Sequence, residues 1–213
     1  MTKPQYAFYF DASRCTGCKT CVVACKDKNN IQEPKVQFRR VYEEAGGDWT
    51  EDKTARTWKQ NVWAYFVSVS CNHCDDPACT KVCPTGAHAK HADVGGLVLI
   101  DQNKCIGCGA CAVACPYEAP QLDRALGKMR KCDMCIDRIS KQRKPVCVEA
   151  CPQRALDFGA VDELRKLYGD DGMIAPLATA DYTRPNLVIR KCTQAQPALE
   201  RTRSWPSFLN DLR

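Results

Sequence analysis

Apolar residues gather in several short runs along this 213-residue chain, and each run predicts a strand. The longest, Val62 to Ser70, alternates with the period of two expected of a half-buried strand. The other predicted strands are Tyr6 to Phe10, Leu97 to Ile100, Arg154 to Gly159 and Leu187 to Ile189. Helical spacing marks Val22 to Lys28, which ends at Asn29, and Val161 to Tyr168. The pattern predicts a loop-rich α+β protein built from short elements.

Membrane-spanning and secretory segments are not expected from this pattern. No run approaches the roughly 18 consecutive apolar residues of a transmembrane helix. The residues Met1 to Pro4 do not begin the apolar segment of a signal peptide. We therefore expect neither feature, and a protein of this kind working outside the cytoplasm would need another route of export.

The cysteines indicate bound metal, because sixteen of the 17 fall into four groups of four. The third group, Cys105-x2-Cys108-x2-Cys111-x3-Cys115-Pro116, matches the bacterial ferredoxin run, whose fourth cysteine binds the neighbouring cluster. The remaining groups are Cys15, Cys18, Cys21 and Cys25, followed by Lys26; Cys71, Cys74, Cys79 and Cys83, followed by Pro84; and Cys132, Cys135, Cys147 and Cys151, followed by Pro152. Repetition of the run predicts several iron-sulfur clusters that share their cysteine loops in pairs.

Two other uses of cysteine compete with iron. Structural zinc sites are usually built from two separated cysteine pairs, not from three thiols within seven residues followed by a fourth and a proline. A disulfide framework suits small secreted chains, and the length, the odd cysteine count and the lack of a signal peptide oppose it here. Both alternatives are weaker than iron-sulfur clusters, and the leftover Cys192 is expected to be an inert free thiol.

Composition supports a fold that depends on its clusters. Hydrophobic residues make up 45% of the sequence, but this figure includes the cysteines, and aromatics reach only 8%. Iron-thiolate bonds would then replace part of the core, so the metal-free protein should fold poorly. Four oxidised cubes with their thiolates carry about eight negative charges, which turns the formal charge of +6 into about −2. The basic excess is better explained by buried anionic clusters than by nucleic-acid binding, for which no motif is present.

Three segments lie outside the cysteine pattern. Gln32 to Gln60 is a polar, irregular insert with Trp49 and Trp58, and we interpret it as a partner surface. Gly127 to Lys144 is basic, which fits charge compensation around a cluster. Beyond Asp170 the sequence becomes rich in proline. A segment of this composition is typical of a tail that is disordered or that wraps a partner. We expect residues 171–213 to form an extended tail that wraps a partner, since Leu199, Trp205 and Phe208 need a place to be buried.

The chain resembles the four-cluster iron-sulfur subunits of the complex iron-sulfur molybdoenzymes, and within them the dimethyl sulfoxide reductase branch. The stretches that carry the resemblance are Arg14 to Cys21, Ala45 to Trp49, Ser70 to Cys74, Asp76 to Pro84 and Arg154 to Gly159. It extends from about Tyr6 to Ile189 and leaves out the last two dozen residues. Relatives in the nitrate reductase branch have tryptophan in place of the cysteine that matches Cys108, so the cysteine here implies four [4Fe-4S] clusters.

The resemblance also implies how the groups pair, the first with the fourth and the second with the third. The implied ligand sets are Cys15, Cys18, Cys21 and Cys151; Cys132, Cys135, Cys147 and Cys25; Cys71, Cys74, Cys79 and Cys115; and Cys105, Cys108, Cys111 and Cys83. This gives two bicluster ferredoxin-like units related by pseudo-symmetry, an outer one from 1–60 plus 126–170 and an inner one from 61–125. Ferredoxin-type modules are expected near 6–35, 62–94 and 96–125.

Loop composition around the ligands differs between groups. Gly17, Gly107 and Gly109 let backbone N–H groups approach sulfur, whereas Asn72-His73 and Asp133-Met134 stand in the second and fourth groups. We expect these differences to stagger the four reduction potentials. His73 is expected to be a hydrogen-bonding loop residue and not a ligand.

The resemblance implies that this protein transfers electrons between two partner subunits. Electrons would enter from a quinol-oxidising membrane anchor at the cluster of the third group and leave from that of the first toward a molybdopterin catalytic subunit. The three subunits would form a heterotrimer on the bacterial cytoplasmic membrane, at its periplasmic face if this subunit is exported together with the catalytic one. The setting would be anaerobic respiration.

Catalysis by this chain alone is not expected, because it has no nucleophile elbow, phosphate loop or metal-hydrolase motif. Two alternatives stay open. The same relay could serve a polysulfide, thiosulfate, tetrathionate or selenate reductase or a formate dehydrogenase. From another class of protein, the chain could be a freestanding iron-sulfur redox sensor.

Overall fold

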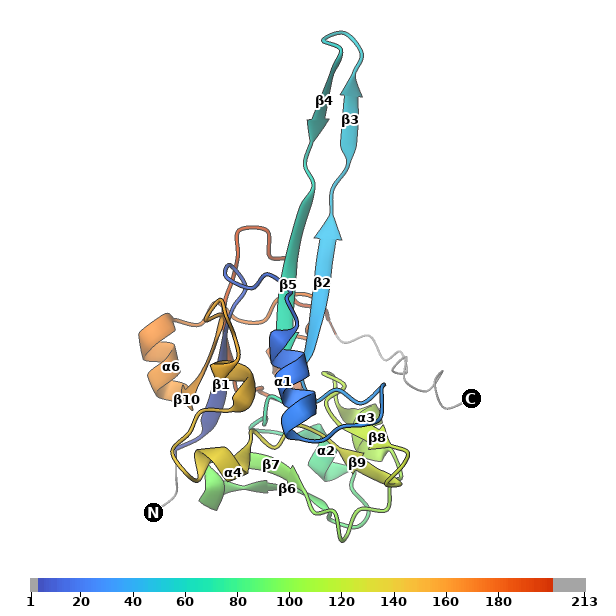
Figure 1. Cartoon of the computed structure of the whole chain (residues 1–213), viewed down its shortest axis with the longest axis vertical. Helices are drawn as coiled ribbons and strands as arrows, with labels where there is room; N and C mark the ends of the chain where they lie inside the picture. Colours follow the sequence, from blue (N-terminus) through green and yellow to red (C-terminus); the bar gives the residue numbers. More distant parts are fainter. Residues whose placement is uncertain (1–3, 201–213) are drawn as a thin grey trace.

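Short strands pair into five separate small sheets in the computed structural model, which describes residues 4–200. The elements form a body from which one long two-stranded arm projects (Figure 1). Among residues 4–200, no helix has both the length and the apolar character needed to cross a membrane. Strands and helices are mixed throughout, as the apolar pattern predicts.

The largest sheet has three strands in the order β10-β1-β11. β1 (Tyr6–Asp11) is central, antiparallel to β10 (Leu156–Ala160) and parallel to β11 (Leu187–Arg190). Helix α6 (Val161–Tyr168) packs on one face, where the rings of Tyr9 and Tyr168 stack with centroids 3.8 Å apart. The sheet therefore places the N-terminal strand next to the segment that follows the fourth cysteine group.

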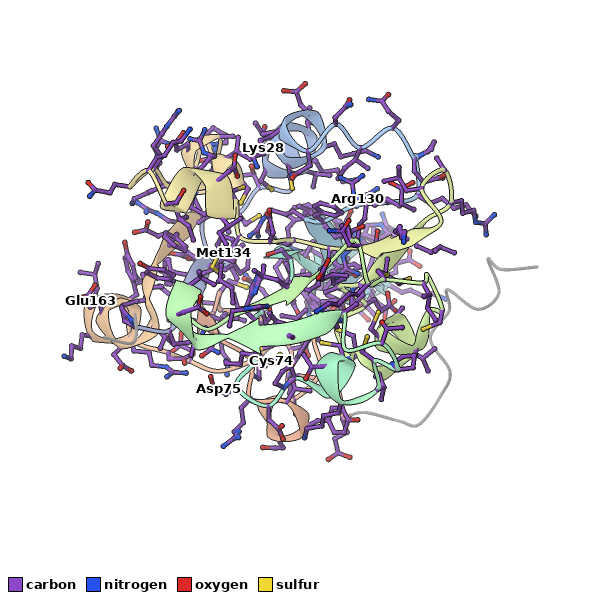
Figure 2. All side chains as sticks on the ribbon, turned by 90° about the horizontal axis from the view of Figure 1, so that it is seen from below. Lys28, Cys74, Asp75, Arg130, Met134 and Glu163 are labelled. Atoms are coloured by element: carbon purple, nitrogen blue, oxygen red, sulfur yellow. The ribbon has the colours of Figure 1, made fainter. Side chains whose placement is uncertain are left out.

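The opposite face of β1 enters the main core. Phe8 and Phe10 are 2% and 0% exposed and pack with aliphatic residues and with cysteines of the first, second, third and fourth groups. A smaller cluster of Ala7, Tyr9, Val161, Leu164 and Val188 on the α6 side contains no cysteine. In Figure 2, seen from the side away from the arm, Met134 lies inside the body and Glu163 of α6 lies at its surface. The main core is thus built around thiols.

Short hairpins and short helical segments complete the body below the arm (Figure 1). One hairpin joins β6 (His88–His91) to β7 (Leu97–Ile100), with a 3-10 turn η1 (Ala92–Val94) between them, and the other joins β8 (Gln121–Asp123) to β9 (Lys128–Arg130). The helices are α1 (Thr20–Lys28), α2 (Ala78–Lys81), α3 (Ala110–Ala114), α4 (Ile136–Ile139) and α5 (Val146–Glu149). Each of these five helices contains or directly follows a cysteine, so each holds a ligand loop in place.

The insert between the first two cysteine groups is more regular than expected. β2 (Arg40–Gly46) pairs with β5 (Trp63–Val69), and β3 (Trp49–Asp52) pairs with β4 (Thr57–Gln60). We call residues 40–69 the arm; its outer half, β3 and β4, stands away from the body (Figure 1). The expectation of an irregular insert is therefore wrong from Arg40 onward, because cross-strand pairing supplies the order that local periodicity does not show.

The first part of the predicted tail lies on this chain's own core. Ile174, Leu177, Val188 and Ile189 are at most 3% exposed, and the Tyr65 hydroxyl donates to the Ala175 carbonyl at 3.1 Å. A short 3-10 turn η2 (Ala180–Tyr182) and bridges from Ile174 to Pro197 and from Ala178 to Leu199 fix the segment. Up to residue 200 the tail is therefore part of the fold. Of the three residues that carried the prediction that it wraps a partner, Leu199 is 54% exposed, and Trp205 and Phe208 lie outside the described residues.

Candidate iron-sulfur centres

The first cysteine group lies in a loop that leads from β1 into α1. Asp11 at the end of β1 accepts hydrogen bonds from the backbone N–H and hydroxyl of Ser13, at 2.9 and 2.5 Å, and so starts the turn. Lys19, in the left-handed region, precedes the helix. Cys21 and Cys25 then lie four residues apart on α1, on the same buried face. The same helix can therefore present thiols to two adjacent sites.

A cavity under the base of the arm is lined by Cys15, Cys18, Cys21 and Cys151. Phe10, Val41, Ser68 and Leu156 close it with other side chains and backbone. The Ser68 hydroxyl lies 3.4 Å from the Cys21 sulfur. Three thiols of the first group and the last thiol of the fourth group thus share one space, although about 130 residues separate them in the sequence.

A second cavity in the interior is lined by Cys71, Cys74, Cys79 and Cys115. It combines three thiols of the second group with the last thiol of the third. Tyr117, Val98 and Lys131 complete its wall. The backbone N–H of Val98 donates to Nδ1 of His73 at 2.9 Å, so His73, which is 0% exposed, holds this loop against β7. The expectation that His73 is a hydrogen-bonding loop residue agrees with this contact.

A third cavity is lined by Cys83, Cys105, Cys108 and Cys111, with Ile100, His88 and Met129 around them. Gly107 in this loop has φ of +71°, and a Cβ at this position would lie 2.3 Å from the Gly127 carbonyl oxygen. The Met129 N–H donates to the Cys105 sulfur at 3.4 Å. The β8–β9 hairpin therefore lies tightly against the third cysteine loop and supplies a hydrogen bond to sulfur.

The four remaining thiols of the groups, Cys25, Cys132, Cys135 and Cys147, are all buried. Burial, and then repulsion from Cys147 and Cys135, raises the pKa of Cys25 to about 12. Burial likewise raises the pKa of Cys132 well above its usual value, with added repulsion from Cys25 and Cys147. Cys25, Cys132 and Cys147 also pack in one buried cluster, and helix α1, which carries Cys25, lies against α5, which carries Cys147. The four thiols combine three of the fourth group with the last of the first.

The electrostatics of these sites favour a bound cation over free thiolates. Burial, and then repulsion from neighbouring thiolates, raises the pKa of Cys74 and of Cys111 to about 12. Such thiols stay protonated in the empty protein, because several anions in an apolar cavity repel one another. Iron supplies the positive charge that the thiolates need, and each set offers the four thiolates that a [4Fe-4S] cube requires. The residues present therefore fit the cluster.

The thiols of the described residues are not arranged as the ligands of a single metal ion. Among residues 4–200, no three His, Cys, Asp or Glu side chains converge closely enough to hold one metal ion. Tetrahedral zinc with Zn–S bonds of about 2.3 Å would bring its sulfurs to within about 3.8 Å of one another. A cube places its thiolates further apart, at its four corners. All 17 cysteines, which lie within the described residues, are free thiols in this structure.

Exposure distinguishes the four thiol sets. Cys18 and Cys108 are the two exposed cysteines of the groups, and they belong to the first and third cavities described. Hydrogen bonds from the side chain and backbone of Thr20 lower the pKa of Cys18, which fits a thiolate near solvent. No member of the set around Cys132 is exposed. Two sets thus reach the surface and two lie inside.

Several residues of these sites have no signal in the spacing of the sequence. Arg39 and Lys131 are 2% and 6% exposed and lie beside buried thiols. His88 lines the cavity of Cys105, and neither of its ring nitrogens has a hydrogen-bond partner among the described residues. Each contact depends on segments far apart in the sequence, so a local pattern could not have identified it.

Comparison with known proteins gives a consistent result. Residues 62–161 and 14–87 each match a family described as 4Fe-4S dicluster domain. The sequence is 56% identical to the B subunit of anaerobic dimethyl sulfoxide reductase from Escherichia coli K12, over 93% of this protein and 94% of that one. It is 55% identical to the corresponding B subunit of Haemophilus influenzae, over 87% and 89% of the two proteins. The thiosulfate reductase electron transfer subunit of Salmonella typhi is 39% identical over 75% and 78%.

Proposed function

This protein belongs to the family of the anaerobic dimethyl sulfoxide reductase B subunits, and we propose that it relays electrons to a molybdopterin subunit that reduces dimethyl sulfoxide. It is an electron-transfer subunit with four [4Fe-4S] clusters, carried by two ferredoxin-like dicluster domains. The chemistry of substrate reduction belongs to the partner, and this subunit supplies the spacing, burial and hydrogen bonding that set each cluster potential.

The proposed ligand sets exchange their last cysteines between groups. They are Cys15, Cys18, Cys21 and Cys151; Cys25, Cys132, Cys135 and Cys147; Cys71, Cys74, Cys79 and Cys115; and Cys83, Cys105, Cys108 and Cys111. Three of these sets each line one cavity, which is the observation that carries the proposal. The fourth set is supported by the mutual repulsion and complete burial of its thiols.

The four sets are proposed to form a linear relay. Cys79 packs in one apolar cluster with Cys105 and Cys111, which supports a contact between the two sets of the inner unit. Cys71 and Cys132 are near enough for their charges to interact, as are Cys147 and Cys21. Cys108 and Cys18 are exposed at the two ends of this series. We propose that electrons enter near Cys108 and leave near Cys18.

The division of the protein into two units is part of the proposal. The outer unit would comprise 1–60 and 126–170, the inner unit 61–125, and the two would be related by pseudo-symmetry. Pairing of β1 with β10 supports the outer unit, because it joins the first and fourth groups across the sheet. The segment from 171 onward is proposed to extend toward a partner beyond residue 200.

Partners are proposed from the relatives and from the arm. Electrons would come from a quinol-oxidising membrane anchor, and the heterotrimer would lie on the periplasmic face of the cytoplasmic membrane. Phe66 and Ser68 at the base of the arm cover the first cysteine loop. The arm extends from there, so a partner that takes electrons near Cys18 would also be within reach of it. We propose that the arm binds the molybdopterin subunit.

Iron and acid-labile sulfide per polypeptide, measured on the anaerobically purified complex, test the relay directly. About sixteen of each, with interacting paramagnetic centres in EPR during stepwise reduction, are expected for four cubes. Zinc, or iron for only two clusters, would overturn the ligand sets. The substrate is tested separately, by asking whether reduced complex is reoxidised by dimethyl sulfoxide and not by thiosulfate. Reoxidation by thiosulfate alone would favour the function named for the Salmonella typhi relative.

A further inference from the structure

Arg39 is a buried cation without a carboxylate partner. Its side chain is 2% exposed, and no carboxylate among residues 4–200 forms an ion pair with it. One terminal nitrogen donates to the carbonyl and hydroxyl oxygens of Ser68, at 3.4 and 3.2 Å, and the other donates to the Ser70 hydroxyl at 3.1 Å. The guanidinium carbon lies 4.5 Å above the ring of Phe8. Neutral oxygens and a ring do not compensate a buried positive charge, which calls for an anion nearby.

The cysteines near Arg39 come from two different ligand sets, and their sulfurs are thiolates when clusters are bound. Burial alone disfavours the charged guanidinium, but the neighbouring thiolates outweigh this effect and raise the pKa of Arg39. In decreasing order of effect they are Cys147, Cys21, Cys132 and Cys25. Cys21 belongs to the first proposed set and the other three belong to the second. The ring of Phe8, over which the guanidinium lies, belongs to the same buried cluster as all four of these cysteines. Arg39 therefore lies close to two adjacent cluster sites, and its charge acts on both.

A hydrogen-bonded path connects Arg39 with one of these thiols. Because the guanidinium donates to the Ser68 oxygen, the Ser68 proton is free to point at the Cys21 sulfur, 3.4 Å away. A hydrogen bond to a ligand sulfur stabilises the more negative, reduced cluster. Ser68 would do this for the first cluster only, since its hydroxyl has one proton to donate.

The neighbouring Arg40 makes different contacts. Arg39 immediately precedes β2 and Arg40 is the first residue of that strand. Arg40 donates to the Tyr117 carbonyl at 2.5 Å and lies 3.8 Å from a carboxylate oxygen of Glu118. The charge of Arg40 lowers the pKa of Cys115, after larger effects of burial and of other neighbours that include Cys71. Two adjacent arginines thus face different cluster sites, and Arg40 has a carboxylate partner where Arg39 has none.

We propose that Arg39 is the shared counter-cation of the two clusters bound by Cys15, Cys18, Cys21 and Cys151 and by Cys25, Cys132, Cys135 and Cys147. Its fixed charge makes both reduction potentials more positive, because each cube gains one negative charge on accepting an electron. Arginine suits this role, since it stays charged at any pH the complex meets. The inference rests on the proposed relay and names the residue that tunes its last two steps.

Redox titration of the holo-complex, followed by EPR, tests the proposal with three variants. In R39Q, two of the four midpoint potentials are expected to become more negative. The equilibrium constant for reduction of each of these two clusters should fall tenfold or more, which is a shift of about 59 mV for a one-electron couple. In S68A the charge remains and the hydrogen bond is lost, so one midpoint should fall. R40Q is the matched control, in which the two midpoints that move in R39Q should stay in place.

The outcomes separate this proposal from the relay itself. Wild-type complex without sixteen irons would overturn the relay, whereas four intact clusters in R39Q with unchanged or uniformly shifted midpoints would overturn only the role of Arg39. If R39Q does not assemble its clusters, the variants R39K and S68A test the role of Arg39 in its place. R39K, which keeps the charge, should assemble four clusters with midpoints near those of the wild type. If all four midpoint potentials are unchanged in S68A, the proposed hydrogen-bonded path from Arg39 to Cys21 is wrong. If R39K lacks two clusters although it keeps the positive charge, the proposal that Arg39 acts as a counter-cation is wrong.

Discussion

The ring of Phe66 on β5 lies against the backbone of Gly17 in the first cysteine loop. A Cβ built on Gly17 would be 2.5 Å from Cδ1 of Phe66, closer than any side chain can lie. Gly17 also has φ of +68°, which an L-residue adopts only with strain. The base of the arm and the first ligand loop therefore fit together only because residue 17 has no side chain.

Substitution of this glycine should remove the first cluster. G17A is expected to lose about a quarter of the iron, since the loop can no longer hold Cys15 and Cys18 under the ring. G109A is the matched control. Gly109 has a similar φ of +77°, but a Cβ there meets nothing within 4 Å. Iron analysis should show near-normal content in G109A; equal losses in both variants would mean that backbone strain, not the ring, governs assembly.

Ligand assignment can be tested with the one cysteine outside the groups. C192A should keep about sixteen irons, because Cys192 lines none of the cavities that enclose the thiol sets. C151A should lose the cluster of the first cavity, or turn it into a three-iron centre with its own EPR signal. A C151A protein that instead lost the signals assigned to the Cys132 set would contradict the exchange of last cysteines between groups.

Removal of iron should unfold the protein unevenly. The main core and the cluster of Cys79, Cys105 and Cys111 include many thiols, whereas the cluster of Ala7, Val161 and Val188 under α6 includes none. Hydrogen exchange after chelation is expected to rise first in the ligand loops and last in the β10-β1-β11 sheet. Zinc added back should not restore protection. Uniform protection before and after chelation would show that the core does not depend on its clusters.

The arm offers a test of the proposed catalytic partner. Trp49 and Trp58 are 61% and 63% exposed and lie on one face of the β3–β4 hairpin, since Trp49 is opposite Gln60 and Trp58 is opposite Glu51. Exposed tryptophans on one face favour protein binding. W49A/W58A should weaken binding of the molybdopterin subunit by about tenfold or more without loss of iron.

The opposite face of the same hairpin provides the control for the arm. Thr50 is paired with Lys59 there, so T50A/K59A changes as many residues without removing an indole. Binding measured by interferometry on the cluster-loaded protein should be near normal in this variant. If the two double variants bind equally well, the tryptophan face is not the surface that the catalytic subunit uses.

Much of the candidate site could be predicted because cysteine spacing is a local property. Three thiols at two-residue gaps are held by one loop, so their common role is encoded within seven residues. The strands at Tyr6, Val62, Leu97 and Leu187 and the helix at Val161 are confirmed as β1, β5, β7, β11 and α6. Their apolar periods depend on burial of one face, which short runs already express.

Contacts between segments that are distant in the sequence are seen only in the tertiary structure. The sequence by itself determined the ligand loops, the short α+β elements and the excess of positive charge, all of which follow from neighbouring residues. The fold brings Cys15 and Cys151 to one cavity, which the resemblance implied but no local pattern shows. Only the fold could turn the insert into a paired arm and bury Ile174, Leu177 and Ile189 in the core. Only the fold sends Arg39 and Arg40 to different cluster sites. Strand pairing and burial are relations between residues far apart in the sequence, and a local pattern carries no record of them.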